Sequence, residues 1–140
     1  MRDDVSEALA IGPSSSYAAR TIDITTTGRR SGEPRRIETT FRRFEDTIYL
    51  SGIPHPQQRA WLLNLEADPN FIFHLKNGLV ADLPASAEVI TDPTERRRIL
   101  TQFVEDFNQQ RMPDSPWPVG VVDEWVEQSP LARVSFADAD

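Results

Sequence analysis

Six short segments of β-type sequence, most of them joined by tight turns, constrain this 140-residue chain more than any other feature. Residues 21–27 and 47–52 are rich in β-branched and aromatic side chains, and residues 70–76 alternate apolar with polar side chains, as a strand with one buried face does. Glycine allows the backbone to reverse at 28–34 and at 77–78. We therefore predict strands at these three segments and at residues 35–44, 79–90 and 131–136.

Helical patterns interrupt the strand segments. Residues 92–111 predict an amphipathic helix with Asp92 as its N-cap. Residues 53–69 predict a shorter helix that begins near Pro56, and residues 121–128 predict one or two further turns. A sheet of six strands loses its exposed edges when it closes on itself. The expected fold is therefore α+β, a six-stranded antiparallel split β-barrel with two or three helices.

The chain has the length of one domain. Residues 1–19 end in a Gly/Pro/Ser-rich stretch that favours neither helix nor strand, so we expect a flexible arm or a weak helix there. Residues 20–137 form the expected single split-barrel domain, and residues 138–140 an acidic, frayed tail. The acidic start and the lack of a long apolar run predict a cytoplasmic protein without a membrane span, and they leave open an association of the arm with a membrane surface.

Charge is distributed unevenly along the chain. The net charge of −7 argues against nonspecific binding to nucleic acid phosphates. Residues 20–45 nevertheless contain seven arginines and four acidic residues, a local net charge of +3. A short basic segment on an acidic body predicts a site for one compact anion. Cysteine is absent, which excludes disulfides, thiolate metal sites and thiol nucleophiles.

The first candidate site is the sequence TTTGRRSGEPR at residues 25–35. Two glycines four residues apart let the backbone approach an anion, while arginine and serine side chains donate hydrogen bonds to it. A phosphate or a polycarboxylate would fit this turn. The alternative is an ordinary exposed hairpin turn with solvated arginines, and the lysine of a Walker loop is missing. The residues that would bind the anion are Arg29, Arg30, Ser31 and Arg35.

The second candidate site is residues 51–61, which run from a strand end through a proline-containing loop into a helix start. Exposed amides at a strand end and the positive end of a helix dipole suit a ring carbonyl or an anion. The alternative is that Trp61 packs in the core and that Ser51 and Gly52 only form a turn.

Other polar and aromatic residues have plainer expected roles. His55 and His74 have no further ligand at suitable spacing, so we predict no metal site, and we expect His74 to be a strand residue with satisfied hydrogen bonds. The three arginines at 96–98 are expected on the solvated side of the long helix. From the residue type alone, Trp117 and Trp125 are expected to form core or oligomer contacts.

The run TTTGRRSGEPRR, together with AWLLNLEADPNFIFHLKNG further along the chain, resembles the deazaflavin-dependent nitroreductase and quinone reductase family over residues 20–136. The resemblance implies the FMN-binding split-barrel fold and coenzyme F420, whose flavin-like ring carries a ribityl phosphate with an oligoglutamate tail. It also implies hydride transfer to a quinone, a nitroaromatic or a similar conjugated acceptor. No catalytic side chain is implied, because the cofactor carries the reaction. By analogy with such barrels we expect a homodimer.

The resemblance also implies which residues surround the cofactor and the acceptor. The basic turn would hold the phosphate and the acidic tail, the strand end would lie along the ring, the helix start would pack beside the ring, and C-terminal aromatic residues would face the substrate. These groups are Arg29, Arg30, Ser31 and Arg35; Leu50, Ser51 and Gly52; Arg59, Ala60 and Trp61; and Trp117 and Trp125.

Departures from the family pattern keep alternatives open. Glu38 stands where many members have apolar residues, and near a phosphate it would be unfavourable unless it pairs with an arginine such as Arg36. Leu62 stands where members often have tyrosine. Related barrels hold FMN, haem or fatty acids, so a non-catalytic binding protein for one of these ligands, or a pure interaction domain, is the alternative to the reductase.

Overall fold

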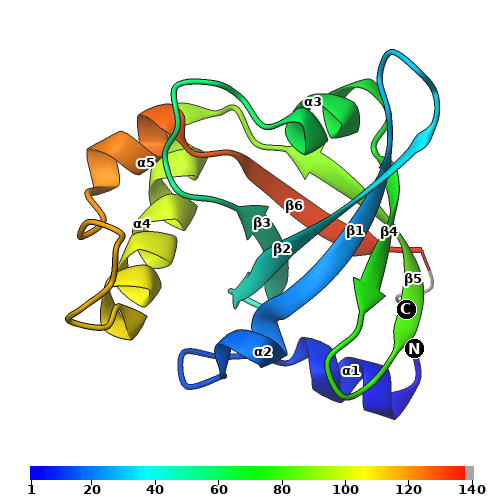
Figure 1. The fold of residues 1–140 in the computed structure, drawn as a ribbon, viewed down its shortest axis with the longest axis horizontal. Helices are drawn as coiled ribbons and strands as arrows, with labels where there is room; N and C mark the ends of the chain where they lie inside the picture. Colours follow the sequence, from blue (N-terminus) through cyan, green and yellow to red (C-terminus); the bar gives the residue numbers. More distant parts are fainter. Residues whose placement is uncertain (138–140) are drawn as a thin grey trace.

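The computed structural model describes residues 1–137, and the tail predicted at residues 138–140 lies outside the described residues. Six antiparallel strands close into a barrel in the order β1-β2-β3-β6-β5-β4, which confirms the predicted fold class (Figure 1). The strands are β1 (Thr21–Thr27), β2 (Pro34–Phe44), β3 (Thr47–Ser51), β4 (Asn70–Leu75), β5 (Ala81–Val89) and β6 (Leu131–Phe136).

Alternation of side chains along the strands fills the interior of the barrel. Ile22 and Ile24 of β1, Phe41 of β2 and Phe73 of β4 are fully buried. The rings of Phe41 and Phe73 meet edge to face, with centroids 5.2 Å apart. Each large apolar side chain contributes about 1.5–3 kcal/mol when it is fully buried. The apolar interior is therefore the main source of stability of the barrel.

Five helices surround the barrel within the described residues, where the sequence predicted two or three. In the view of Figure 1, α3 lies above the barrel, α1 and α2 lie below it, and α4 and α5 lie to its left. None of these helices is long and apolar enough to cross a lipid bilayer within residues 1–137. The helices are α1 (Asp3–Leu9), α2 (Tyr17–Arg20), α3 (Ala60–Ala67), α4 (Pro93–Gln110) and α5 (Val122–Gln128).

Residues 1–19, for which a flexible arm or a weak helix was expected, contain α1 and most of α2. Helix α1 buries Val5 and Leu9 in the apolar core of the barrel. These two residues are four apart, so they share one face of the helix. Gln110 of α4 also donates a hydrogen bond to the carbonyl oxygen of Pro13 at 2.9 Å. The segment is thus packed against the domain through α1 and through the loop between α1 and α2.

Helix α3 is shorter than the helix expected for residues 53–69. It begins at Ala60, and Pro56 is therefore not its first residue. His55 Nδ1 accepts a hydrogen bond from the backbone N–H of Gln57 at 3.0 Å, a local turn that competes with the helix. The residues between β3 and α3 therefore form a loop.

Helix α4 has the expected N-cap and buried face. The Asp92 carboxylate accepts a hydrogen bond from the backbone N–H of Glu95 at 2.9 Å. The apolar face of α4 packs against α5 and the start of β6 in a second core, outside the barrel. The fully buried residues of this core include Ile99, Leu100 and Leu131.

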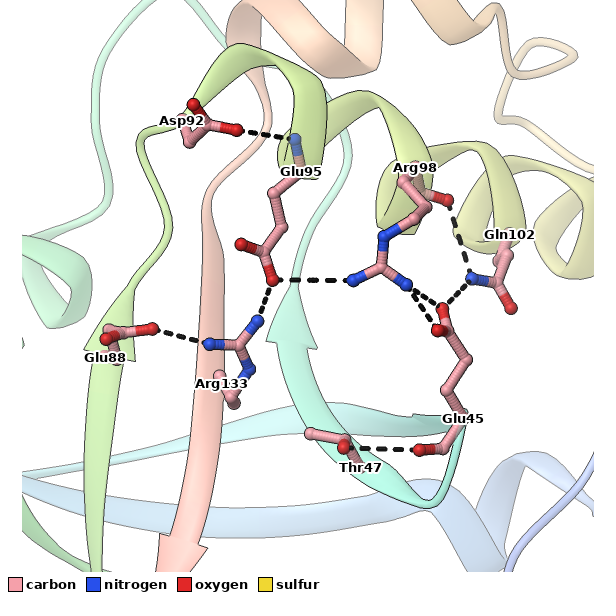
Figure 2. Close-up of polar contacts among 8 residues, drawn as sticks. All are labelled: Glu45, Thr47, Glu88, Asp92, Glu95, Arg98, Gln102 and Arg133. Atoms are coloured by element: carbon pink, nitrogen blue, oxygen red, sulfur yellow. Dashed lines mark hydrogen bonds and ion pairs between the residues drawn. The ribbon is translucent and has the colours of Figure 1, made fainter.

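Ion pairs tie the outer side of α4 to the barrel (Figure 2). Glu95 pairs with Arg133 of β6, and Arg98 pairs with Glu45 in the turn between β2 and β3. Gln102 donates a hydrogen bond to the same Glu45 carboxylate at 2.9 Å. These groups are between 30% and 49% exposed, and a single ion pair near the surface contributes roughly 0–1 kcal/mol. They hold the orientation of α4 more than they stabilise the fold.

Arg96 departs from the solvated position expected for residues 96–98. Its Nη2 donates hydrogen bonds to the carbonyl oxygens of Val126 and Ser129, both at 2.7 Å, and its Nη1 donates to that of Ile90 at 3.2 Å. These carbonyls lie at the end of α5 and after β5, where a helix terminus leaves acceptors unsatisfied. Arg96 therefore points inwards, and of the three arginines only Arg97 and Arg98 are exposed.

A buried charge cluster joins α4 to the barrel. The carboxylate of Asp106 accepts hydrogen bonds from Arg20 Nη1 at 2.5 Å and from Arg42 Nε at 2.6 Å. Arg20 and Asp106 are almost completely buried, and Arg42 is mostly buried. Because two guanidinium groups share one carboxylate, the cluster carries one uncompensated positive charge.

Candidate functional site

The turn between β1 and β2, residues 28–33, is fixed to α3 by one buried amide. Asn64 Oδ1 accepts a hydrogen bond from the backbone N–H of Arg29 at 3.0 Å, and Asn64 Nδ2 donates to Thr26 Oγ1 at 3.0 Å. Sequence reasoning missed Asn64, because an asparagine within a helical pattern has no spacing that would relate it to a distant turn. The fold alone brings the two together, and the turn is held beside α3.

Ser31 and Arg35 are engaged in contacts within the turn. Ser31 Oγ accepts hydrogen bonds from the backbone N–H of Glu33 at 3.1 Å and from Arg35 Nη2 at 3.3 Å. Arg35 also pairs with the Glu33 carboxylate at 3.7 Å. A Cβ atom at Gly28 would lie 2.7 Å from Ser31 Oγ, so glycine is needed for this compact turn. These contacts are those of the ordinary hairpin turn that was the alternative for this segment.

Arg29 and Arg30 are the groups of this turn that remain available to an anion. Both are exposed, and neither side chain has a hydrogen-bond or ion-pair partner within residues 1–137. A cavity of about 450 Å³ adjoins the turn at Gly32 and Pro34. The tip of the hairpin therefore combines two guanidinium groups that have no counter-charge within the described residues with a neighbouring cavity.

Glu38 is neutralised by a different partner from the one expected. It pairs with Lys76, which follows β4, and Arg36 pairs instead with Asp23 at 2.9 Å. Lys76 also lies 2.7 Å from Asp23. The hydrogen bond from Lys76 is the main reason that the pKa of Asp23 is lowered. These charges compensate one another along the stem of the hairpin, away from its tip.

Strand β3 ends beside the start of α3. The side chain of Leu50 is fully buried in the barrel core, so only its backbone is available to a ligand. Ser51 Oγ donates a hydrogen bond to the carbonyl oxygen of Pro130 at 2.6 Å. A Cβ atom at Gly52 would lie 3.0 Å from Arg59 Nη2, so the absence of a side chain allows Arg59 to lie against the strand end.

The start of α3 presents Arg59 and buries Trp61. Arg59 Nη2 donates to the carbonyl oxygen of Ile53 at 2.7 Å, while its Nη1 is buried without a hydrogen-bond partner in the described residues. Burial lowers the pKa of Arg59, but a guanidinium group stays charged at neutral pH. Trp61 packs in the barrel core, as its plainer interpretation predicted, and Ala60 is exposed.

The two tryptophans predicted for the substrate pocket line one cavity with the end of β3. This cavity, of about 520 Å³, lies between Ser51 and Gly52 on one side and α4 with its following loop on the other. Trp125 is 4% exposed and belongs to the second core as well, whereas Trp117 is 52% exposed at the cavity. We call it the aromatic cavity, because its wall includes Phe103, Phe107, Trp117 and Trp125.

Arg42 also lines the aromatic cavity, and sequence reasoning missed it. Its Nε donates to Asp106 and its Nη1 to the carbonyl oxygen of Phe41 at 3.2 Å, which leaves Nη2 without a partner within residues 1–137. Burial is the main cause that lowers the pKa of Arg42, and Arg20 adds to it, while Asp106 opposes the shift. No sequence pattern relates Arg42 to Asp106, because 64 residues separate them.

The hairpin arginines are not brought into the aromatic cavity. Neither Arg29 nor Arg30 lines it. Helix α3 contacts the turn through Asn64, and Arg59, which immediately precedes α3, lies against Gly52 at the end of β3.

The histidines contact protein groups. His74 Nε2 lies 2.7 Å from Thr25 Oγ1 and its Nδ1 lies 2.7 Å from Asp82 Oδ1, which confirms its expected role as a satisfied strand residue. In the part of the chain that the structure describes, no three His, Cys, Asp or Glu residues are grouped so that they could hold a metal ion.

Comparisons with known proteins relate this chain to a family and its fold to solved structures. The model of the F420H2-dependent quinone reductase family matches residues 10–124. The fold is similar to that of a conserved hypothetical protein from Mycobacterium tuberculosis, with a TM-score of 0.63, 19% sequence identity, and coverage of 98% of this chain and 81% of that chain. The search of curated proteins found no match.

Two further solved structures share the barrel. An F420 reductase gives a TM-score of 0.56 with 14% identity over 84% of this chain and 86% of that chain. A haem storage protein from Vibrio cholerae gives a TM-score of 0.59 with 15% identity over 86% of this chain and 83% of that chain. At these identities the solved structures establish the fold, whereas the family model covers most of the sequence.

Proposed function

Because this chain belongs to the F420H2-dependent quinone reductase family, we propose that it transfers a hydride from reduced F420 to a quinone, a nitroaromatic or a similar conjugated acceptor in the aromatic cavity. Family membership makes the protein an oxidoreductase with coenzyme F420 as its cofactor. The observation that carries the finer proposal is a cavity that combines the backbone at the end of β3, an aromatic wall and the Arg42 guanidinium.

The residues present fit the two chemical parts of the cofactor. Arg29 and Arg30, charged and without partners in residues 1–137, suit a phosphate and carboxylates. The backbone at Ser51 and Gly52, with Arg59 against it, suits a planar ring with carbonyl oxygens. In this proposal the other predicted residues hold the turn, the strand end and the helix start in place: Ser31, Arg35, Leu50, Ala60 and Trp61.

The chain's own contribution is orientation and exclusion of water. When bound, the reduced deazaflavin ring supplies the hydride. Trp117 and Trp125 offer planar faces on which a conjugated acceptor stacks. Stacking fixes the acceptor in one plane, and such positioning removes part of the entropic cost of a reaction between two molecules. The apolar wall also displaces water, which strengthens electrostatic interactions inside the cavity.

Arg42 is the polar group that we assign to the acceptor. Negative charge develops on a quinone or nitro oxygen as the acceptor receives a hydride, and a fixed donor beside that oxygen stabilises the charge. Asp106 holds Nε of Arg42, so its unpartnered Nη2 is held as well. Arg20 shares the same carboxylate, and the cluster therefore presents a net positive charge at this side of the cavity.

Binding and turnover together test this function. Purified protein should bind oxidised F420 with roughly micromolar affinity in calorimetry, and it should oxidise reduced F420 when menadione is added. Binding without turnover of menadione or of a nitroaromatic compound would contradict the reductase and favour a carrier. FMN serves as the control ligand, because tight binding of FMN with no binding of F420 would overturn the assignment of the cofactor-binding residues.

We also propose a homodimer. The support is a group of exposed apolar side chains in the loop between α4 and α5, which a second copy would cover. Light scattering at micromolar concentration should give twice the monomer mass, and a monomeric mass would contradict the proposal. A cytoplasmic location stays a prediction from the sequence. The exposed apolar residues of the loop that do not line the aromatic cavity are Val119 and Val121.

A further inference from the structure

A third cavity, of about 330 Å³, borders the loop that connects β3 to α3. Arg59, Leu62 and Glu66 line it from the start and outer turn of α3, and Arg96 and Ser129 line it from α4 and the end of α5. We call it the α3–α5 cavity. The function proposed above makes no use of this space, although Arg59 borders it.

Two residues that line the α3–α5 cavity each have a buried polar atom that no protein group satisfies. Within residues 1–137, Arg59 Nη1 and Ser129 Oγ are the buried side-chain nitrogen and oxygen atoms without a hydrogen-bond partner, and both residues line this cavity. Ser129 is only 4% exposed. Buried polar groups in folded proteins are nearly always paired, so two such atoms at one cavity indicate a missing partner.

The backbone around Ser129 is held firmly, which fixes its hydroxyl group at the cavity. The N–H of Ser129 donates to the carbonyl oxygen of Trp125 at 2.9 Å, and the carbonyl oxygen of Ser129 accepts from Arg96 Nη2 at 2.7 Å. On the opposite side, Arg59 Nη2 is held by the carbonyl oxygen of Ile53. Both unpartnered atoms therefore belong to groups whose other contacts are already made.

Two guanidinium groups and two carboxylates line this cavity, and the guanidinium groups are the more buried of the four. Arg59 and Arg96 make hydrogen bonds only to carbonyl oxygens, which satisfy their N–H groups without neutralising them. Glu66 and Glu127 also line the cavity, but neither forms an ion pair with these arginines within the described residues. The first turn of α3 adds the positive end of its dipole beside Arg59.

We propose that the α3–α5 cavity binds a single phosphate or carboxylate group of a ligand, with Arg59 Nη1 and Ser129 Oγ as its hydrogen-bond donors. A guanidinium nitrogen can only donate, so the missing partner must be an acceptor. An oxyanion matches both the donors and the uncompensated charge of Arg59 and Arg96. The site itself stands on the geometry of this cavity, and it rests on the proposed function only for the source of the anion, an acidic group of F420 or of an acidic acceptor.

Inorganic phosphate is the direct probe of this site. In NMR titrations at constant ionic strength, phosphate should produce saturable shifts of the Ser129 backbone amide and of the Arg59 side chain. Arg59→Gln should weaken phosphate binding about tenfold, and Ser129→Ala about threefold, as expected when one charged or one neutral hydrogen bond is lost. Arg97→Gln is the matched control, because Arg97 lies next to Arg96 in sequence but is exposed and pairs with Asp123.

Several results would overturn the proposal. Shifts that do not saturate, or equal phosphate affinity in Arg59→Gln and Arg97→Gln, would show that no specific anion site exists in this cavity. If Arg59→Gln fails to fold, Arg59→Lys serves as a second variant, since it keeps the charge. Arg59→Lys alone should bind phosphate more tightly than the double variant Arg59→Lys with Ser129→Ala. Equal affinity of those two variants would also contradict the proposal.

Competition experiments identify the source of the anion and keep the two proposals separable. If the anion belongs to F420, phosphate should weaken binding of intact F420 several-fold and leave binding of a deazaflavin that lacks the phosphate and tail unchanged. If it belongs to the acceptor, phosphate should raise the KM of a carboxylated naphthoquinone and not that of menadione. Competition with neither would overturn the functional role of the site. Failure to bind F420 at all would refute the proposed function, while the phosphate titration would still report on the cavity.

Discussion

Two kinds of arginine occur in the candidate sites, and they differ in their surroundings. One kind lies at the hairpin tip, and the other lies beside the aromatic cavity and the α3–α5 cavity. Arg29 and Arg30 are exposed and have no partners in residues 1–137. Arg42 and Arg59 are held at 2.6 and 2.7 Å by fixed acceptors, and each keeps at least one guanidinium nitrogen without a partner there. Water and salt screen an exposed cation, whereas a buried one acts at low dielectric constant. The tip is therefore suited to attract an anion, and the cavities to orient one.

The largest effect expected from this difference is on stability, at Asp106. Asp106→Asn leaves Arg20 and Arg42 as buried, unneutralised charges, and it should lower the free energy of unfolding by about 3–5 kcal/mol. Urea denaturation of the folded protein measures this loss. The matched control is Asp123→Asn, which removes an exposed partner of Arg97 and should cost no more than about 1 kcal/mol. Similar losses of stability in both variants would show that burial of an arginine does not determine how strongly folding depends on its carboxylate partner.

The second effect is on catalysis, at Arg42. Arg42→Gln removes the charge beside the acceptor, and it should lower kcat with menadione about 10- to 100-fold while the Kd of F420 stays unchanged. The neighbouring Arg43→Gln is the control, because Arg43 does not line the aromatic cavity and pairs only loosely with Asp46 at 3.9 Å. Steady-state kinetics and calorimetry separate the two parameters. A change confined to the Kd of F420 would place Arg42 with the cofactor and not with the acceptor.

The barrel was predictable from the sequence because its determinants are local. Alternation at residues 21–27 and the turn signals at 28–34 and 77–78 operate over a few residues, and the structure has β1 and the hairpins there. Asp92 as the N-cap of α4 is also a local signal. The same local reasoning could not decide between a flexible arm and a weak helix for the N-terminal segment, because its Gly/Pro/Ser stretch obscured the single helical face formed by Val5 and Leu9.

Only part of the candidate sites was predictable, because the spacing of residues along the sequence does not show which of them lie close together in the fold. The cluster of arginines near Arg30 is visible in the sequence as a run of charge. Arg42 and Asp106 are 64 residues apart, and Arg29 and Asn64 are 35 apart, so their contacts follow only from barrel closure. Ser129 carries no signal at all in the sequence, and it is identified only by its burial and its missing partner.

The third effect tests whether Arg59 needs its close fit against the end of β3. Gly52→Ala places a Cβ atom 3.0 Å from Arg59 Nη2, so the guanidinium must shift. We expect an affinity for F420 about 3- to 10-fold weaker, the effect of a modest steric displacement. Gly12→Ala is the control, because its Cβ would meet nothing within 4 Å. Calorimetry with both variants measures the difference, and an unchanged Kd in Gly52→Ala would remove Arg59 from the cofactor-binding residues.

The fourth effect is smaller, because the hairpin tip is exposed. Arg30→Ala should weaken F420 binding about 2- to 5-fold at low salt, and the difference should shrink as salt is added. The free energy of unfolding should change by no more than about 0.5 kcal/mol. Arg97→Ala, another exposed arginine, is the control. A loss that persists at high salt would mean that the tip closes around the cofactor, and it would break the distinction between attracting and orienting arginines.

The smallest effect concerns the stem of the same hairpin, where the charges are paired but remain near the surface. The hydrogen bond from Lys76 lowers the pKa of Asp23 from its ordinary value of 3.8. The pKa of Asp23 is lower in the folded than in the unfolded state. The pair with Lys76 therefore stabilises the fold at pH values above the ordinary pKa, and this contribution is lost as the pH falls through the folded pKa. Asp23→Asn should therefore reduce stability near neutral pH and flatten its decline in acid, whereas Asp46→Asn, whose carboxylate is fully exposed, should leave that decline as in the wild type. Urea denaturation between about pH 6 and about pH 3 measures both slopes. An unaltered slope in Asp23→Asn would mean that water screens even these paired groups, so that only the buried arginines make a measurable electrostatic contribution to folding.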